Sequence, residues 1–380
     1  MTDIERILPL WRELETASAD YVLATVVAVE GSSYRKPGAC MLLAPDGRRA
    51  GTVSGGCLEA EVARRAWWLS EKGPVVQRYS SQEEDGDFPY GSGCGGVVYL
   101  LLERRSTASP LLAALERAFE LRAPLAVAAI LDGPLIAQRA FAGLLGSVPD
   151  LGSISSELQD LADAALERMT SMERVISFNG AMTNAWADFR PARPGLWIFG
   201  AGDDASPLLA LAEEMGWFVT VADGRSQLAT PARFPNADAV HVLSIKDLPR
   251  NPSAEHMPAF AEFHPTDAAV LLTHSFEQDA RILATLLSLR FPLAYIGVLG
   301  PQRRTRELLA EAARLLELPA NETLIERWLA EIHSPMGLDL GAESPETIAL
   351  SVLAEIQQSL TAATGLPLRE VRAASLTTPN

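Results

Sequence analysis

The chain contains little cysteine, and the positions of the few cysteines are informative. Three cysteines occur among 380 residues, too few for the paired disulfide framework of a small secreted protein. The count therefore favours a reducing compartment. Cys40 lies in an apolar run, as a packing cysteine does, whereas Cys57 and Cys94 stand among glycines, in residues 54–59 and 91–96. These two cysteines are the first candidates for a functional site.

Other absences narrow the function. No run approaches the roughly 18 apolar residues that a membrane span requires, and residues 1–15 are mixed and charged rather than signal-like. We expect a cytoplasmic protein with no membrane partner. The net charge is −16, from 32 basic and 48 acidic residues without a basic stripe, which argues against nucleic acid as a partner. An anionic small ligand is still allowed, because backbone N–H groups can hold phosphates.

Zinc-binding patterns are absent as well. There is no C-x-x-C spacing, and all five histidines fall in the second half of the chain, away from the cysteines. We therefore expect no metal site. A catalytic cysteine–histidine pair could form only through the tertiary fold, so we name no catalytic residue.

The pattern of apolar residues predicts an α/β protein with two domains. In residues 1–190 we expect a mixed α+β domain, with strands at 21–29, 96–103, 125–130 and 135–140, a hairpin turning at Asp46-Gly47, and helices at 58–69, 110–121 and 157–170. In residues 191–380 short apolar strands alternate with helical patterns, which predicts a Rossmann-like domain with a parallel sheet. Residues 190–195, rich in proline and arginine, are the predicted linker.

A glycine-rich turn opens the second domain. Residues 200–205 read G-x-G-x-x-A between a predicted strand and a predicted helix, with Gly200 for the tight turn and Gly202 for close approach of a pyrophosphate. Asp223 ends the next strand, near where an acidic residue would hold ribose hydroxyls. Arg225 either accommodates an extra phosphate or pairs with Asp223. This pattern supports an NAD(P)-dependent oxidoreductase, or a Rossmann-like domain without a dinucleotide.

The two cysteine turns suggest a different chemistry. At the start of the helix predicted for residues 58–69, the helix N-terminus would lower the pKa of the Cys57 thiol. Gly55 and Gly56 would leave backbone N–H groups free for an anion. Glu59 either complements the helix dipole or contacts a ligand. Cys94 with Gly95 repeats the theme, and the alternative for both cysteines is a buried thiol in a tight glycine turn.

Charged residues near predicted turns complete the candidate set. Arg35 and Lys36 follow the first strand and either contact a phosphate or are solvated loop charges. Arg303 and Arg304 follow a glycine turn at the expected sheet edge. His274 lies at the C-terminal end of a predicted sheet strand, where ligands of such sheets gather.

Taken together, the motifs resemble the XdhC/CoxI family of maturation factors for xanthine and carbon monoxide dehydrogenases. The resemblance covers roughly residues 10–360 and rests on the joint presence of these segments: 31–39, 51–59 with Cys57, Cys94-Gly95-Gly96, 199–202, 223–225, 233–237, 272–274 with Asp279, 295–300 with Arg303-Arg304, 334–341 and 343–351. Two positions depart from the family pattern, Asp203 where histidine is usual and Pro301 where serine is usual.

The resemblance implies a chaperone that binds molybdenum cofactor (molybdopterin, in mononucleotide or dinucleotide form). The implied partners are a cysteine desulfurase, which supplies the terminal sulfido ligand, and an apo molybdenum hydroxylase such as xanthine dehydrogenase; a homodimer is also implied. The cofactor-binding residues that we expect on this basis are Cys57, Cys94, Gly55, Gly56, Glu59, Gly95, Arg35, Gly200, Gly202, Asp223, Arg225, His274 and Arg303. NAD(P) is the alternative ligand.

Overall fold

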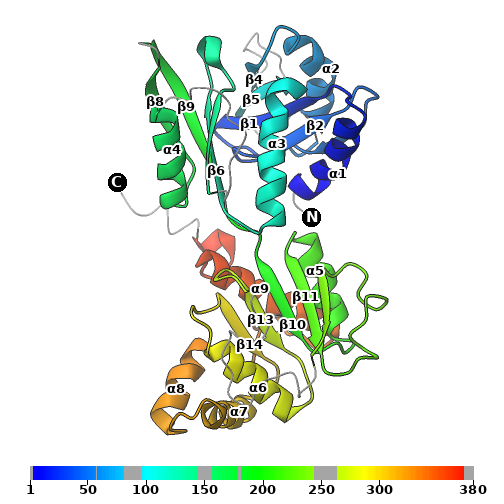
Figure 1. Cartoon of the computed structure of the whole chain (residues 1–380), viewed down its shortest axis with the longest axis vertical. Helices are drawn as coiled ribbons and strands as arrows, with labels where there is room; N and C mark the ends of the chain where they lie inside the picture. Colours follow the sequence, from blue (N-terminus) through cyan, green and yellow to red (C-terminus); the bar gives the residue numbers. More distant parts are fainter. Residues whose placement is uncertain are drawn as a thin grey trace. The chain divides into compact units, whose positions relative to one another are not determined.

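The computed structural model describes residues 3–56, 58–80, 96–143, 156–178, 181–243 and 263–371. The chain divides into two compact units, Met1–Arg193 and Pro194–Asn380. The first contains antiparallel sheets with helices and the second a parallel sheet with helices, so the predicted fold class is confirmed. Figure 1 shows the elements of each unit. Cys57, Cys94 and Gly95, which the sequence singled out, lie outside the described residues.

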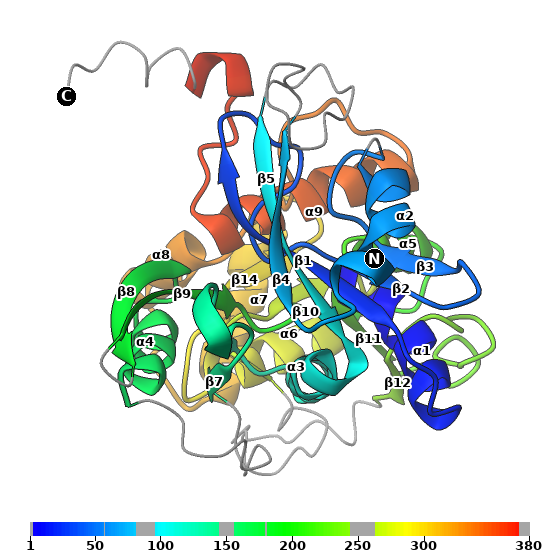
Figure 2. The same ribbon diagram turned by 90° about the horizontal axis from the view of Figure 1, so that it is seen from above.

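The N-terminal unit contains a five-stranded antiparallel sheet with the order β3-β2-β1-β5-β4. Its strands are β1 (Val22–Glu30), β2 (Cys40–Leu43), β3 (Arg49–Gly51), β4 (Val75–Ser80) and β5 (Val97–Arg104). Helices α1 (Asp3–Thr16) and α3 (Arg105–Glu120) pack on one face, and α2 (Glu59–Leu69) packs on the other. Successive residues of β1, such as Leu23 and Ala24, point to opposite faces of the sheet and therefore belong to two different cores. Figure 2 shows β1, β4 and β5 side by side.

A second antiparallel sheet of the N-terminal unit has the order β7-β6-β9-β8. Its strands are β6 (Leu125–Ile130), β7 (Arg139–Ala142), β8 (Met172–Phe178) and β9 (Ala181–Arg190), and α4 (Ser156–Glu167) covers one face. The antiparallel pair β8–β9 is absent from the sequence prediction because its strands mix polar and apolar residues without strict alternation. Trp186 on the other face packs against Val27 and Leu101 of the first sheet.

Two predictions for the N-terminal unit are wrong in detail. The strand expected at residues 135–140 is a short 3-10 turn, Gly133–Leu135, followed by β7 at Arg139–Ala142, because Gly133-Pro134 favours a turn. The helix expected to begin at Pro110 begins at Arg105. Proline is a start signal in the first helical turn, but here it lies in the second turn, where the helix forgoes one backbone hydrogen bond.

The C-terminal unit has a five-stranded parallel sheet with the order β12-β11-β10-β13-β14. Its strands are β10 (Gly195–Phe199), β11 (Phe218–Asp223), β12 (Ala239–Val242), β13 (Ala268–Leu271) and β14 (Tyr295–Val298). The alternation of these strands with helices is the one that the sequence predicts for this half of the chain. The order reverses between β10 and β13, which makes this pair the topological switch point of the sheet.

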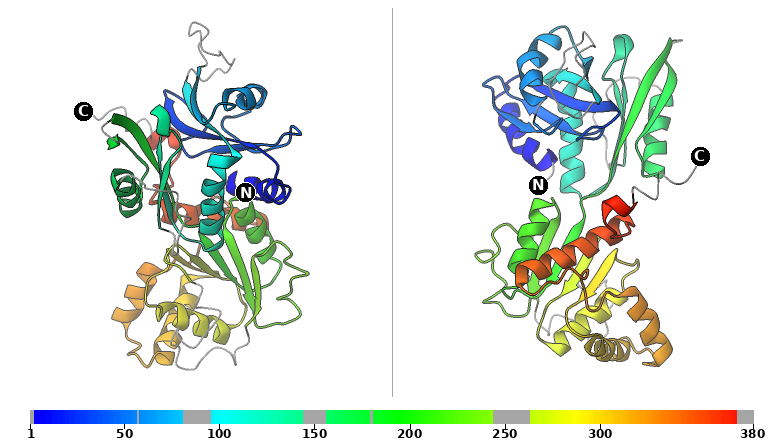
Figure 3. Two further views of the ribbon diagram at one scale, coloured as in Figure 1. Left: turned by 45° about the horizontal axis from the view of Figure 1, so that its top comes forward. Right: turned by 180° about the vertical axis from the view of Figure 1, so that it is seen from behind.

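Helices cover both faces of the parallel sheet. On one face lie α6 (Phe276–Leu287), α7 (Gln302–Leu315) and α8 (Glu322–Glu331), with Trp197 and Phe199 at the centre of the core. On the other lie α5 (Ala205–Glu214) and α9 (Pro345–Thr361), packed around Val219 and Tyr295. Figure 3 shows the long α9 crossing the sheet. Because all five strands are parallel, their carboxyl ends lie at one edge of the sheet, and the glycine-rich turn lies at this edge.

Candidate functional site

Three loops of the N-terminal unit meet at one end of the first sheet. β1 ends at Glu30, which pairs with Val97 at the start of β5. A Cβ on Gly96 would overlap the backbone oxygen of Ser32, so only glycine allows this close approach. The ring of Tyr34 lies over Gly55, since a Cβ on Gly55 would be 3.5 Å from the ring's Cγ. We call residues 31–37, residues 52–58 without Cys57, and Gly96 the glycine-loop cluster.

A buried carboxylate fixes the second of these loops. Glu59, at the start of α2, accepts hydrogen bonds from the backbone N–H groups of Val53 (3.1 Å) and Ser54 (2.8 Å) and from the Ser54 hydroxyl (2.6 Å). The Ser54 Oγ in turn accepts the N–H groups of Gly56 and Leu58, both at 3.1 Å. The loop that contains Cys57 in its sequence is therefore held on both sides of that residue.

The hydrogen bonds assign Glu59 a role that the sequence did not predict. Burial raises the pKa of the Glu59 carboxyl, but the bonds from Ser54 and the nearby backbone outweigh it and leave the pKa below its usual value. Its oxygens therefore position the loop. The Gly56 N–H is already bonded, contrary to the expectation that it is free, whereas the Gly55 N–H has no partner in the described part of the chain. Ser54, which the sequence did not single out, is recognisable as a serine five residues before a glutamate at a helix start.

Arg35 and Lys36 differ in their surroundings. The Arg35 guanidinium forms an ion pair with Asp3 of α1, which ties its charge to the helix. Lys36 is exposed, and its ammonium has no ion-pair partner among the described residues. Of the two cations in this loop, Lys36 is therefore the one available to an anion. Cys40 is buried, as its apolar surroundings indicated.

The glycine-rich turn of the C-terminal unit lies at the switch point. Gly200 has φ +124°, and a Cβ there would be 2.9 Å from the backbone carbon of Leu272, just beyond β13. Gly202, in contrast, faces open space, with nothing within 4 Å of a Cβ. The fold therefore requires glycine at position 200, whereas Gly202 is the position that leaves room for a ligand. Asp203, one of the departures from the family pattern, pairs with Arg233 at 2.9 Å.

Asp223 is occupied by protein donors. Its Oδ1 accepts the backbone N–H (2.8 Å) and Nε (3.0 Å) of Arg225, and its Oδ2 accepts the Ala201 N–H (2.7 Å) and another guanidinium nitrogen of Arg225 (2.7 Å). Four donors fill the acceptor capacity of a carboxylate, and only 1% of Asp223 is exposed. In this arrangement Asp223 fastens the glycine-rich turn to β11 and has no acceptor left for a ribose hydroxyl.

A polar cluster follows β13 and β14 at the same edge. Asp279 of α6 is fully buried and accepts from the Thr273 hydroxyl and, at 2.6 Å, from Arg304. Burial raises the pKa of Asp279 despite these two donors. His274 is exposed beside this group. Arg303 is 90% exposed and pairs with Glu307 along α7, so Arg304, rather than Arg303, is the arginine that this edge holds in place.

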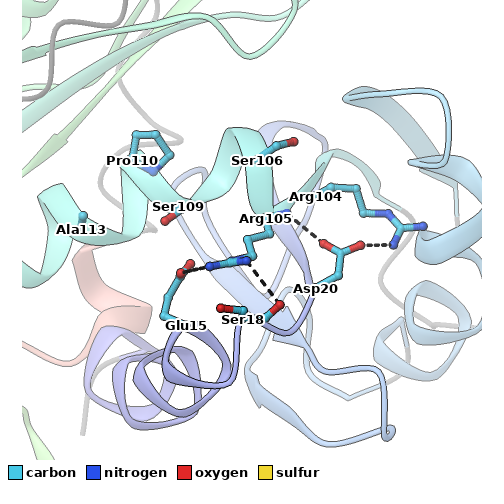
Figure 4. A pocket seen from close by; sticks show the side chains of 9 residues that line it. All are labelled: Glu15, Ser18, Asp20, Arg104, Arg105, Ser106, Ser109, Pro110 and Ala113. Atoms are coloured by element: carbon cyan, nitrogen blue, oxygen red, sulfur yellow. Dashed lines mark hydrogen bonds and ion pairs between the residues drawn. The ribbon is translucent and has the colours of Figure 1, made fainter.

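A pocket elsewhere in the N-terminal unit has a volume of about 670 Å³ and contains none of the predicted site residues. Figure 4 shows Glu15 and Asp20 facing Arg105 and Arg104 across it. Arg105 binds Glu15 at 2.7 Å, and Arg104 binds Asp20 at 2.7 Å. The bond from Arg105 lowers the pKa of Glu15 to about 2. Because the acids in its wall neutralise both arginines, this pocket is a poor anion site.

Two kinds of feature are absent from the described ranges. No group of three or more histidine, cysteine, aspartate or glutamate residues in those ranges could hold a metal ion. Among the helices of the described residues, none is both long enough and apolar enough to cross a membrane.

Comparisons with known proteins agree with this architecture. Residues 14–80 match the model of the XdhC and CoxI family, and residues 196–356 match the model of the XdhC Rossmann domain. A Bacillus subtilis protein, named for a probable role as a xanthine dehydrogenase subunit, is 34% identical over 347 residues, which are 89% of this chain and 92% of that protein. The Escherichia coli molybdenum cofactor insertion chaperone PaoD is 26% identical, over 88% of this chain and 82% of its own length.

A solved structure is similar over nearly the whole chain. The crystal structure of a protein described as a xanthine dehydrogenase from Bacillus halodurans superimposes with a TM-score of 0.66 at 29% identity. The match covers 95% of this chain and 96% of the other. Both units are therefore shared with that protein.

Proposed function

This chain belongs to the XdhC and CoxI family, and we propose that it is a chaperone that carries molybdenum cofactor as its cargo. In this proposal it shelters the cofactor while a cysteine desulfurase supplies the terminal sulfido ligand. It then delivers the cofactor to an apo molybdenum hydroxylase such as xanthine dehydrogenase. No catalytic step is assigned to its own residues.

The observation that supports the proposal most is the glycine-loop cluster. A molybdenum cofactor is a pterin with an anionic tail, and its metal and dithiolene sulfurs are soft, so thiolates are suitable neighbours. The described part of the cluster offers the exposed Tyr34 ring, the exposed Lys36 ammonium and the Gly55 N–H, and a carboxylate, Glu59, holds its backbone in place. Cys57 and Cys94 stay predicted cofactor contacts. PaoD, similar over most of the chain, is named for cofactor insertion.

An NAD(P)-dependent oxidoreductase is the second candidate, because the glycine-rich turn lies at the switch point of a parallel sheet. The occupied carboxylate of Asp223 weighs against it. The same edge suits the nucleotide tail of a dinucleotide cofactor, with Gly202 as the residue that leaves room for it.

The deciding experiment measures pterin, molybdenum and nucleotide in protein purified from a host that makes the cofactor. Wild type is compared with Cys57→Ala and Cys94→Ala, and with Cys40→Ala as a control in which a buried thiol is removed instead. We expect near-stoichiometric pterin in wild type and in the control, and loss of pterin in either loop variant.

Other results would redirect the proposal. Wild-type protein without pterin but with copurified nicotinamide nucleotide would replace the chaperone with the oxidoreductase. Pterin retained in both loop variants would remove the two cysteines from the site. Binding of the loaded protein to a purified desulfurase and to the apo-hydroxylase tests the two partners, and light scattering tests the homodimer.

A further inference from the structure

The side chain of Tyr34 is unusually exposed for a large aromatic residue. It is 76% exposed, and its hydroxyl has no hydrogen-bond partner among the described residues. Tyrosine combines a large apolar face with a polar tip and is enriched where proteins bind other molecules. Apart from its approach to Gly55, no interaction with the described part of the N-terminal unit accounts for the position of this side chain.

The ring lies face-on to the backbone below it. A Cβ on Gly55 would be 3.5, 3.6 and 3.8 Å from the Cγ and the two Cδ atoms of Tyr34. These nearly equal distances mean that the ring presents its face, rather than its edge, to Gly55. A Cβ at position 55 would therefore touch the ring at ordinary van der Waals distance.

Both loops that bear these groups are held in place. Glu59 and Ser54 bond the backbone on either side of Gly55 and Gly56. On the other side, Gly96 packs against the backbone of Ser32, two residues before Tyr34. An aromatic face supported in this way loses little conformational entropy when a ligand binds.

We propose that Tyr34 is the stacking residue of this site and binds one face of a flat heteroaromatic ring. The inference rests on the proposed function, in which that ring is the pyrimidine ring of the cofactor's pterin. Stacking on an aromatic side chain contributes about 1–3 kcal/mol for nucleobases, which are rings of similar size. Tyr34 therefore contributes to the affinity for the pterin.

The test compares pterin content, released and oxidised to its fluorescent form, per mole of protein. The variants are Tyr34→Phe, which keeps the ring, Tyr34→Leu, which keeps apolar bulk without a ring, and Tyr34→Ala. Trp68→Ala is the matched control, because Trp68 is an aromatic residue of the same unit, 68% exposed, on α2. Thermal unfolding confirms that each variant is folded.

We expect Tyr34→Ala and Tyr34→Leu to lose about tenfold in bound pterin, with Tyr34→Phe and Trp68→Ala within about twofold of wild type. Wild-type pterin content in Tyr34→Leu or Tyr34→Ala would overturn the stacking role while leaving the proposed function intact. A variant that binds pterin normally but no longer binds the apo-hydroxylase would overturn it in favour of a protein contact. If wild type itself contains no pterin, the proposed function fails first.

Discussion

Buried carboxylates hold the loops and side chains of both candidate sites in place. Glu59 holds the loop before α2, Asp223 fastens the glycine-rich turn, and Asp279 holds Arg304. Each accepts hydrogen bonds that water would otherwise supply, so removing one of them leaves buried donors unsatisfied. The residues that shape these sites are therefore different from those expected to touch a ligand.

Glu59→Gln tests this role. The amide keeps the shape but loses the charge and one acceptor oxygen, so we expect a loss of about 1–3 kcal/mol in the free energy of unfolding, measured with urea. Glu61→Gln on the same helix is the control, because Glu61 forms partly exposed pairs with Arg64 and Arg65, which contribute little. Equal stability of the two variants would contradict the assignment.

The pKa of Glu59 determines how the difference in stability between wild type and Glu59→Gln depends on pH. The folded-state pKa lies below the ordinary 4.5, so ionisation of Glu59 stabilises the folded protein fully above that value. The stabilisation is lost as the pH falls through the lower folded-state pKa. The stability gap between wild type and Glu59→Gln should therefore be constant from about pH 7 to 5 and shrink in more acidic solution. A gap that grows on acidification would exclude this ionisation as its source.

At the scale of elements, the ends of strands and helices position the candidate groups. The turn after β10 combines a strained glycine, Gly200, with an unconstrained one, Gly202. Helix α9 begins with a capping box, in which Ser344 and Thr347 bond each other's backbone N–H groups. Further along α9, Glu355 binds Tyr295 (2.6 Å) and the Gly337 N–H (2.6 Å), which fixes the loop after His333.

Substitutions in the glycine-rich turn should distinguish the glycine that the fold requires from the glycine that leaves room for a ligand. Gly200→Ala places a Cβ against Leu272 at a positive φ, so we expect a loss of about 1–3 kcal/mol in stability. Gly202→Ala meets no atom and should change stability by less than about 0.5 kcal/mol. Denaturant unfolding and bound nucleotide are measured for both. Unchanged nucleotide content in Gly202→Leu, a bulky variant, would indicate that this turn does not bind the cargo.

The capping box of α9 gives a second test at this scale. Ser344→Ala removes the acceptor for the Thr347 N–H and should cost about 1 kcal/mol in the free energy of unfolding. Thr347→Ser retains a hydroxyl that can bond the Ser344 N–H and serves as the control. If the two variants unfold at the same denaturant concentration, the cap contributes nothing measurable to α9.

At the scale of the whole molecule, the chain has two units, and each has its own sheets and cores. The apolar clusters of the described residues each lie within one unit. Such units can in principle fold independently. The two candidate sites also belong to different units, the glycine-loop cluster to the first and the sheet edge to the second.

Separate cores predict separate unfolding transitions in calorimetry. Glu59→Gln should lower the midpoint of one transition and Gly200→Ala that of the other, each leaving the remaining midpoint within about 1 °C. Bound cargo should raise the transition of the unit that holds it. A single transition that both substitutions shift equally would show that the units unfold as one.

The sequence by itself determined the fold class, the strand–helix alternation of the second half and the family. These depend on local patterns of apolar residues and glycines, which repeat at the spacing of each element. It also identified both glycine-rich regions, because a glycine needed for close backbone approach stands out in the chain.

Only the tertiary structure decided which side chains are free to bind. Glu59, Asp223 and Gly56 read as ligand contacts but are bonded within the protein, and Arg304 rather than its neighbour Arg303 is held at the sheet edge. Tyr34 is distinguished by exposure and by Gly55 beneath it. Solvent exposure arises from packing, as do the contacts between distant segments, such as Ala201 N–H with Asp223 and Arg304 with Asp279. No local pattern encodes them.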